Sequence, residues 1–301
     1  MIRARNPQSI KNKISIIIAN YNTKSILRDC LNNLEGKYPN LEVIVVDNGS
    51  VDGSYEMVKK QFPWVKSIKE ENKGISHAYN IGIEESTGDY YLFLGSDAFP
   101  KKETLSGLLN YMENNLRVGI CTPKLLLRDG TLDMDAHRGL PTPWAAFTHF
   151  SKLGRLFPNT KIFGQYFLSY EDMSKPHEIG LCISHFMFVR KEVFDSVIGW
   201  DEDFFVFGED VDFCYRVKEA GWKIMYLPQF EVLHLKGVSV GIRRSSKDIS
   251  KASMDTKSKM RGHTVKAMKL FYEKHYMHKY PWVMTKIIYA GIRAMRFLRG
   301  F

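Results

Sequence analysis

Residues 90–97 read Tyr90-Tyr91-Leu92-Phe93-Leu94-Gly95-Ser96-Asp97, and this stretch decides the fold class. Its first five residues form an apolar run, which predicts a short strand buried on both faces. A carboxylate just beyond such a strand lies at the carboxyl edge of a sheet, where open α/β sheets bind ligands. Asp97 can hold a divalent cation there. The alternative is that Asp97 caps a helix whose first turn is Pro100-Lys101-Lys102-Glu103.

Strands and helices alternate on the N-terminal side of this run. The hydrophobic pattern predicts strands at Ile14–Ile18, Leu41–Val46 and Val65–Lys69, and helices at Thr23–Leu34, Asp52–Lys60 and Ile75–Glu85. Thr23 is expected to cap the first helix. Such alternation implies right-handed crossovers and a mostly parallel sheet. The fold class is therefore α/β, with a Rossmann-like central sheet flanked by helices and a nucleotide-binding half.

The C-terminal side is less regular. Residues 122–177 contain five prolines and are expected to form loops and short strands. Beyond them, the pattern predicts a strand at Phe186–Val189, a helix at Val211–Ala220, and two strands, Lys223–Leu227 and Glu231–Leu235, separated by Pro228. Residues 264–301 are expected to be helical, basic and aromatic. These residues either lie on an anionic bilayer or pack on the preceding domain, and both alternatives stay open.

The bulk composition limits the partners and the compartment. The 301 residues include 43 Lys and Arg against 33 Asp and Glu, a formal net charge of +10 that suits an anionic partner. The four cysteines are widely spaced and are expected to be reduced thiols of a cytoplasmic protein. Residues 1–13 lack the apolar core of a signal peptide, and no apolar run reaches the length of a membrane-spanning helix.

Two further acidic clusters follow predicted strands or precede helices. Asp47-Asn48 ends the second strand, and for these residues ligand binding and turn formation are equally favoured. The third cluster, Trp200 to Asp212, sets acids among aromatic rings, which desolvate a carboxylate and suit a general base. The alternative is a helix N-terminus that carries acids, and both can hold at once, because Glu209 and Asp210 would open the helix that carries Asp212. His234 joins a cation site only if it meets Asp97 in space.

These motifs, taken in order, resemble the family-2 glycosyltransferases of GT-A fold, most closely the bacterial rhamnosyltransferase-type members. The resemblance covers about residues 14–240. It rests on residues 15–22 (SIIIANYN), 43–50 (VIVVDNGS), 72–82 (NKGISHAYNIG), the strand ending at Asp97, residues 199–205 (GWDEDFF), 209–212 (EDVD), and His234 with Gly237 and Ser239.

The resemblance implies a role for each matching position. The nucleotide-binding residues would be Ala19, Asn20, Tyr21, Asp47, Asn48, Asn72, Gly74, Asn80 and Ser96. Asp97 and His234 would bind Mn²⁺ or Mg²⁺, and Asp210, with Glu209 beside it, would be the catalytic base. The chain departs from the family in two places: Gly95-Ser96 stand where the metal motif carries another acid or Asn-Pro, and Ser184-His185 stand where a small residue is usual.

The implied function is an inverting, metal-dependent transfer of a sugar from a nucleotide-sugar donor to a hydroxyl group. The expected donor is dTDP-rhamnose, with a UDP-sugar as the alternative. The acceptor would be a saccharide or lipid-linked saccharide in cell-surface polysaccharide synthesis. The departure at Gly95-Ser96 keeps a catalytically impaired nucleotide-sugar-binding protein as the rival. Nucleic-acid binding is disfavoured, because the strand-end clusters are acidic.

The expected organisation has three parts. Residues 1–13 form a basic extension, residues 14–240 form the GT-A domain, and residues 241–301 form a basic, mostly helical extension. Within the GT-A domain, residues 14–98 would be the nucleotide-binding half and residues 99–240 the acceptor and catalytic half. The protein is expected in the cytoplasm, with attachment to the inner face of the cell membrane as a further expectation.

Overall fold

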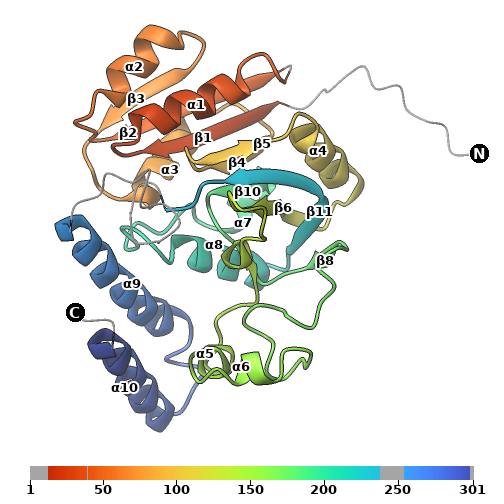
Figure 1. Ribbon diagram of the computed structural model, residues 1–301, viewed down its shortest axis with the longest axis vertical. Helices are drawn as coiled ribbons and strands as arrows, with labels where there is room; N and C mark the ends of the chain where they lie inside the picture. Colours follow the sequence, from red (N-terminus) through yellow and green to blue (C-terminus); the bar gives the residue numbers. More distant parts are fainter. Residues whose placement is uncertain (1–12, 39, 238–253, 299–301) are drawn as a thin grey trace, which may run out of the picture.

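A nine-stranded mixed sheet forms the centre of the computed structural model, which describes residues 13–38, 40–237 and 254–298 (Figure 1). The strand order is β3-β2-β1-β4-β10-β6-β11-β5, and β8 pairs with β11. The strands are β1 (Ile14–Asn20), β2 (Leu41–Asn48), β3 (Lys66–Glu70), β4 (Tyr90–Leu94), β5 (Ala98–Pro100), β6 (Val118–Leu126), β8 (His177–Glu178), β10 (Phe186–Arg190) and β11 (Lys223–His234). A separate two-stranded sheet pairs β7 (His137–Arg138) with β9 (Leu181–Cys182).

The first four strands along the chain are parallel neighbours, as the alternating pattern predicts. β10 then runs antiparallel to both β4 and β6, while β11 is parallel to β6. The register places Asn20 beside Asp47 at the ends of β1 and β2. It also places His234 beside Ala98, because β11 and β5 are antiparallel. These two pairings bring the ends of distant strands to one edge of the sheet.

Helices cover both faces of the sheet. One face packs against α1 (Lys24–Leu34), α2 (Ser54–Gln61) and α4 (Thr104–Asn114), through side chains such as Leu27 and Leu105. The other face packs against α3 (Ile75–Glu84), α7 (Glu192–Ser196) and α8 (Glu209–Glu219), around Tyr79, Trp200 and Phe213. The expected α/β architecture, a central sheet flanked by helices, is confirmed. All four cysteines are free and buried.

One alternative and two local predictions are wrong. Residues after Asp97 form β5 rather than a helical turn, and α4 begins only at Thr104, so Asp97 does not cap it. The two strands predicted around Pro228 are one continuous strand, β11, whose register shifts between Leu227 and Glu231 and so accommodates the proline. Thr23 makes no side-chain cap on α1, and its hydroxyl group donates to Asn20.

The middle of the chain is more ordered than predicted. Its first residues complete β6, and the short elements η1 (Met134–Ala136), α5 (Pro143–Phe150) and α6 (Leu153–Leu156) follow. The C-terminal helices, α9 (Met254–His275) and α10 (Trp282–Leu298), lie together at one end of the molecule (Figure 1). Within the described ranges, no helix is long and apolar enough to cross a membrane. Ser239, residues 1–12 and most of the polar stretch 245–258 lie outside the described residues.

Candidate functional site

The ends of β1 and β2 carry a buried network of polar side chains. The Asn20 amide nitrogen donates to Asp47 Oδ2 over 2.9 Å, and the Asn20 amide oxygen accepts from Thr23 Oγ1 over 2.6 Å. Thr23 Oγ1 in turn lies 3.0 Å from Ser96 Oγ. Asp47 Oδ1 accepts the backbone N–H of Ser50. The side chains predicted to bind a nucleotide at Asn20, Asp47 and Ser96 are therefore connected.

Asn48 and Gly74 form the next part of this edge. The Asn48 amide nitrogen donates to the Gly74 carbonyl over 3.1 Å, while its buried oxygen Oδ1 accepts no hydrogen bond from the described residues. Gly74 has a φ of +104°, and a Cβ there would lie 2.6 Å from the Phe205 carbonyl oxygen. Only glycine allows this close approach of the Phe205 backbone. The free Asn48 oxygen is available to a hydrogen-bond donor.

The other predicted nucleotide residues differ in their surroundings. Ala19 is half-buried, Asn72 is exposed, and Tyr21 is 41% exposed. Both ends of the Asn80 amide are occupied: its nitrogen donates to the Trp200 carbonyl and to Glu202, and its oxygen accepts the Trp200 N–H. In this structure Asn80 therefore holds the segment that leads to Asp210. Its role toward a nucleotide stays a prediction.

Asp97, His185 and His234 meet at the same edge of the sheet. One ligand atom from each residue lies within 4.8 Å of the other two. Asp97 follows β4, His185 immediately precedes β10, and His234 ends β11. The backbone N–H of Leu235 donates to the Asp97 carbonyl over 2.9 Å, which fixes the two strand ends together. The sequence condition for a cation site, that His234 meets Asp97, is fulfilled.

His234 presents a lone pair to Asp97. Its Nδ1 lies 2.9 Å from Asp133 Oδ2, and because a carboxylate only accepts, Nδ1 carries the hydrogen. In the neutral imidazole the other nitrogen, Nε2, is an acceptor; it lies 3.6 Å from Asp97 Oδ1 and receives no hydrogen bond from the described residues. His234 is only 2% exposed. Two buried acceptors that face each other suit a divalent cation between them, with Asp133 as the orienting carboxylate.

Asp133 was not predicted from the sequence. It is fully buried in the loop after β6, and besides His234 it binds Lys236, which also pairs with Asp135 over 2.8 Å. Burial raises the pKa of Asp133, but the hydrogen bond from His234 and the Lys236 charge outweigh burial and hold this pKa well below its usual range. Asp133 is therefore a fixed anion. In the sequence, only the closely spaced acids Asp133 and Asp135 could have pointed to this carboxylate.

Glu209 and Asp210 open α8 with different surroundings. Glu209 is buried; its Oε1 accepts from Ser184 Oγ over 3.1 Å, and its Oε2 has no partner among the described residues. Burial, with Asp210 next to it, raises the pKa of Glu209 to about 8. Asp210 is half-buried. Burial raises its pKa, and the nearby Arg138 charge lowers it in part. A carboxylate with a raised pKa in a half-open position can accept a proton.

Arg138, on β7, is a second residue of the site that was not predicted from the sequence. Its guanidinium group donates to Tyr166 Oη over 2.8 Å and to the Asp135 carbonyl over 3.1 Å. Burial lowers its pKa, but Tyr166, Asp210 and Asp135 together raise it above the ordinary value. Arg138 therefore places a fixed positive charge near Asp210.

The third acid of this cluster, Asp212, is structural. It is fully buried, and both of its oxygens are occupied. Oδ1 lies 2.6 Å from His275 Nε2 on α9, and Oδ2 lies 2.7 Å from Arg216 Nη2. Arg216 also donates to the carbonyls of Ile198 and Gly199. Asp212 therefore joins α9 to α8 and has no oxygen left for a substrate.

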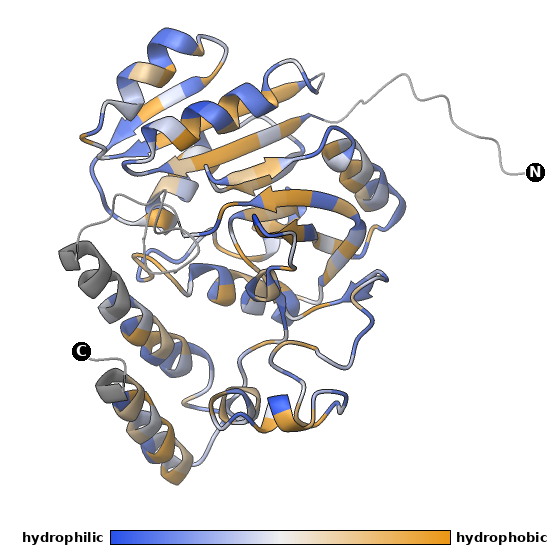
Figure 2. Cartoon of the chain, in the orientation of Figure 1, coloured by the Kyte–Doolittle hydropathy of each residue, from blue (hydrophilic) through white to orange (hydrophobic). Residues whose placement is uncertain are grey.

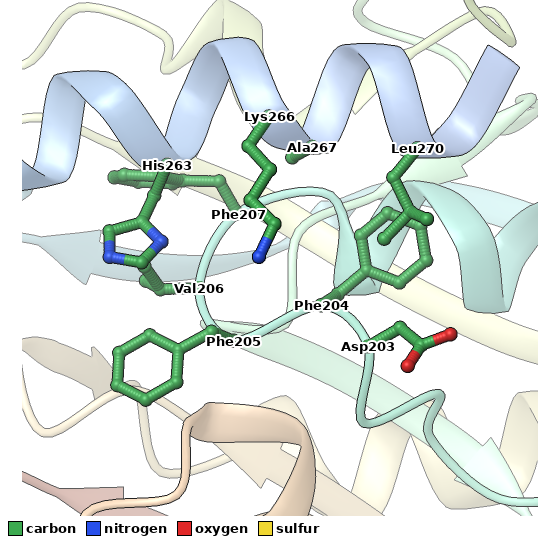
Figure 3. A pocket seen from close by; sticks show the side chains of 9 residues that line it. All are labelled: Asp203, Phe204, Phe205, Val206, Phe207, His263, Lys266, Ala267 and Leu270. Atoms are coloured by element: carbon green, nitrogen blue, oxygen red, sulfur yellow. The ribbon is translucent and has the colours of Figure 1, made fainter. Parts of the chain in front are cut away.

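The loop before α8 is held between α3 and α9. The backbone N–H of Ile75 donates to the Phe205 carbonyl, and the Ser76 hydroxyl group donates to the Phe204 carbonyl. On the other side, His263 of α9 stacks on Phe205 with ring centroids 5.1 Å apart. A small hollow opens there, lined by Asp203, Phe204, Phe205, Val206, Phe207, His263, Lys266, Ala267 and Leu270 (Figure 3). Residues of α9 thus reach the loop that carries Asp210.

Comparison with known proteins gives one matching family and several curated relatives. The model of the glycosyl transferase family 2 matches residues 15–198. An N-acetylglucosaminyl-diphospho-decaprenol L-rhamnosyltransferase of Mycobacterium tuberculosis is 28% identical over 215 residues, which cover 67% of this chain and 68% of the relative. Rhamnosyltransferase WbbL of Escherichia coli is 26% identical over 229 residues, which cover 73% of this chain and 83% of the relative.

Two solved structures have a similar fold. GalNAc-T7 with UDP, GalNAc and Mn²⁺ has a TM-score of 0.55 at 16% identity; the match covers 88% of this chain and 56% of that one. The mannosyltransferase PcManGT of Pyrobaculum calidifontis, in complex with GDP-Man and Mn²⁺, has a TM-score of 0.53 at 17% identity. That match covers 95% of this chain and 81% of the other. Both likenesses concern the fold.

Proposed function

We propose that this chain, which belongs to glycosyl transferase family 2, moves a sugar from a nucleotide-sugar donor to an acceptor hydroxyl group with inversion at the anomeric carbon. The observation that carries this proposal is the Ser184–His185 step before β10. Ser184 binds Glu209, and His185 lies beside Asp97, so the two acidic clusters meet at this step. Their meeting supports one site in which a diphosphate and a base lie on either side of the reacting carbon.

Asp210 is the proposed base. As the acceptor oxygen attacks C1 of the sugar, its hydroxyl proton passes to the Asp210 carboxylate, and the nucleoside diphosphate leaves from the opposite face. Glu209, protonated at neutral pH by virtue of its raised pKa, adds no second negative charge beside the base. Mn²⁺ or Mg²⁺, when bound at Asp97 and His234, supplies charge stabilisation for the departing diphosphate. Asn48 Oδ1 offers a free acceptor to the nucleotide.

We propose dTDP-rhamnose as the donor, with a UDP-sugar as the alternative. Two relatives with rhamnosyltransferase names, at 28% and 26% identity, support this choice. The mycobacterial name also supports a lipid-linked saccharide as the acceptor, in cell-surface polysaccharide synthesis. A thermal-shift series with dTDP, UDP and GDP, each with and without Mn²⁺, tests the donor, since a specific ligand raises apparent stability by mass action. The largest metal-dependent shift is expected with dTDP, and a larger shift with UDP or GDP would overturn this choice.

The Asp210→Asn variant tests catalysis. Loss of a general base lowers the rate of transfer or donor hydrolysis by about 10²- to 10⁴-fold, while nucleotide binding remains. The matched control is Asp195→Asn, which removes an exposed carboxylate on α7. Sugar transfer at the wild-type rate in Asp210→Asn would refute the assignment of Asp210 as the base. Nucleotide binding without turnover in the wild-type protein would instead support the impaired nucleotide-sugar-binding protein, which the absence of an acid at Gly95 motivates.

We also propose attachment to an anionic membrane face through α10. Trp282 is 68% exposed and Ile287 59% exposed, and the Lys286 ammonium group lies 4.5 Å from the Trp282 ring centroid. Figure 2 shows apolar residues along this helix. Residues 275–301 contain no acid. Aromatic and cationic side chains together bind the interface of an anionic bilayer. Sedimentation with phosphatidylglycerol vesicles is expected to fall in the Trp282→Ser, Lys286→Glu variant, and unchanged binding would refute this attachment.

A further inference from the structure

We propose that His185 is a third protein ligand of the cation site, so that two imidazoles and one carboxylate make this site select Mn²⁺ over Mg²⁺. The inference deepens the proposed function, because it concerns the same cation site. In the sequence, His185 stands out only as a departure from the family pattern. The structure places it beside Asp97 and His234, with ligand atoms mutually within 4.8 Å.

The separation of these atoms suits a single ion. Ligand atoms about 2.1 Å from a divalent ion lie roughly 3 to 4 Å from one another. His234 and Asp97 already satisfy this spacing at 3.6 Å. The rings of His185 and His234 have centroids 5.2 Å apart and are tilted by 49°, so they do not stack face to face. A small inward movement of His185 completes a three-ligand set, which leaves other positions for donor oxygens and water.

Gly95 makes room for His185. A Cβ at this position would lie 2.7 Å from His185 Cδ2 and 2.9 Å from Asp97 Oδ1. Both distances are shorter than real side chains allow, so any residue other than glycine would displace a proposed ligand. A carboxylate at position 95 and His185 in its observed place therefore exclude each other. Compared with the family pattern, this chain therefore offers a nitrogen ligand just before β10 in place of an oxygen ligand just after β4.

The backbone around His185 holds it in place. The His185 carbonyl accepts the Gly95 N–H over 2.9 Å, and the next residue, Phe186, pairs with Leu94 in the sheet. On the other side, the Ser184 hydroxyl group is bound to Glu209. The backbone of His185 is thus fixed on both sides of the residue, as expected of a metal ligand carried by a rigid element.

The ligand set decides the preferred metal. Mg²⁺ favours oxygen ligands and retains its water, whereas imidazole nitrogen suits later first-row ions. The affinity of a nitrogen-containing site rises from Mn²⁺ toward Co²⁺ and Zn²⁺. Each imidazole nitrogen in the site therefore raises the affinity for Mn²⁺ more than the affinity for Mg²⁺. Removal of His185 is expected to reduce the affinity for Mn²⁺ and hardly that for Mg²⁺.

The test measures metal binding alone, without donor or acceptor. Free Mn²⁺ is titrated by electron paramagnetic resonance against the full-length protein, and Mg²⁺ is measured by competition. The His185→Ala variant should bind Mn²⁺ about tenfold more weakly or worse, with Mg²⁺ changed by about twofold at most. Pulsed measurements of ¹⁴N couplings should fall from two coordinated imidazoles to one. The control is His278→Ala, which removes an exposed histidine.

Two further variants keep the inference falsifiable if His185→Ala folds poorly. His185→Gln retains the bulk of the side chain but offers an amide, and it should lose the same ¹⁴N coupling. Gly95→Ala retains all three ligands and displaces them, so it should also weaken Mn²⁺ binding. Mn²⁺ affinity and ¹⁴N couplings equal to wild type in folded His185→Gln would overturn the inference. If the His185 variants lose Mn²⁺ binding and the wild-type protein transfers no sugar, His185 is upheld as a ligand and the proposed function is refuted.

Discussion

Two buried acid–histidine pairs in this protein differ in their hydrogen bonding. Asp212 and His275 form a closed pair: both Asp212 oxygens are occupied, by His275 and Arg216. Asp97 and His234 form an open pair: the facing atoms are 3.6 Å apart, and His234 Nε2 has no donor among the described residues. In the closed pair both carboxylate oxygens have a partner, so a structural role explains it. In the open pair two acceptors face each other, and a bound cation would satisfy both.

The histidines of the two pairs are oriented by different means. Asp133 holds His234 from behind, so that its free nitrogen faces Asp97. His275 instead directs its Nε2 at the acid, because α9 carries it there to anchor α8. Burial alone therefore does not distinguish a ligand from a structural residue. The number of polar atoms without a hydrogen-bond partner distinguishes them, and it differs among Asp97, Asp212 and Glu209.

The largest effect is expected for Asp97→Asn. Loss of the carboxylate removes a proposed metal ligand, and the metal would contribute several kcal/mol to stabilisation of the leaving group, so kcat should fall by about a thousandfold or more. The metal-free protein should become no less stable, since the amide introduced at this position can donate to His234 Nε2. Steady-state kinetics and urea unfolding measure the two quantities. Strong destabilisation with activity retained would show that the open pair is structural after all.

The converse is expected for Asp212→Asn. Removing one member of a buried ion pair leaves Arg216 uncompensated, and the free energy of unfolding should fall by about 3 kcal/mol. α9 should become sensitive to proteolysis, because its contact with α8 through His275 is lost. At a temperature where the variant is folded, kcat/KM should stay within about tenfold of wild type. Asp195→Asn serves as the control. A variant of wild-type stability that lacks activity would make Asp212 a substrate contact.

The smallest effect concerns Glu209, which has one paired and one unpaired oxygen. With a pKa raised from 4.5 to about 8, native Glu209 keeps a proton that the unfolded chain releases, so its contribution to stability falls as pH rises between these values. Glu209→Gln lacks this dependence. The stability of Glu209→Gln relative to wild type should therefore rise from pH 5 to pH 9. Urea unfolding across this pH range measures it, and a flat difference would contradict the raised pKa.

Much of the fold was predictable, because it depends on local pattern. The strand at Tyr90–Leu94 was placed at its observed bounds, and the alternation before it gave the parallel strands. The partners of His234 were not predictable. Asp133 lies 101 residues away in an irregular loop, and only the tertiary fold brings it there. Pro228 was misleading, since a register shift accommodates it inside β11.

For the C-terminal helices, the choice between membrane attachment and packing on the domain depends on tertiary contacts that the sequence pattern does not reveal. Phe271 and Tyr272 of α9, and Tyr276 just after its end, are buried in one cluster with Tyr215 of α8, so this helix packs on the domain. α10 leaves Trp282 exposed, so the membrane alternative now concerns α10 alone. His185 was visible in the sequence without a role, because its neighbours Gly95 and Asp97 belong to another strand end.

The contact between Gly74 and Phe205 has a consequence for modular exchange. By sequence, residues 14–98 are expected to form the nucleotide-binding half, which an engineer would transplant as one piece onto a new acceptor half. The Gly74 turn, however, accommodates the Phe205 backbone, and the Asn80 amide binds both the N–H and the carbonyl of Trp200. A graft that ends at residue 98 would leave these groups without their complement. The smallest transplantable unit is therefore discontinuous: it includes residues 200–205 as well.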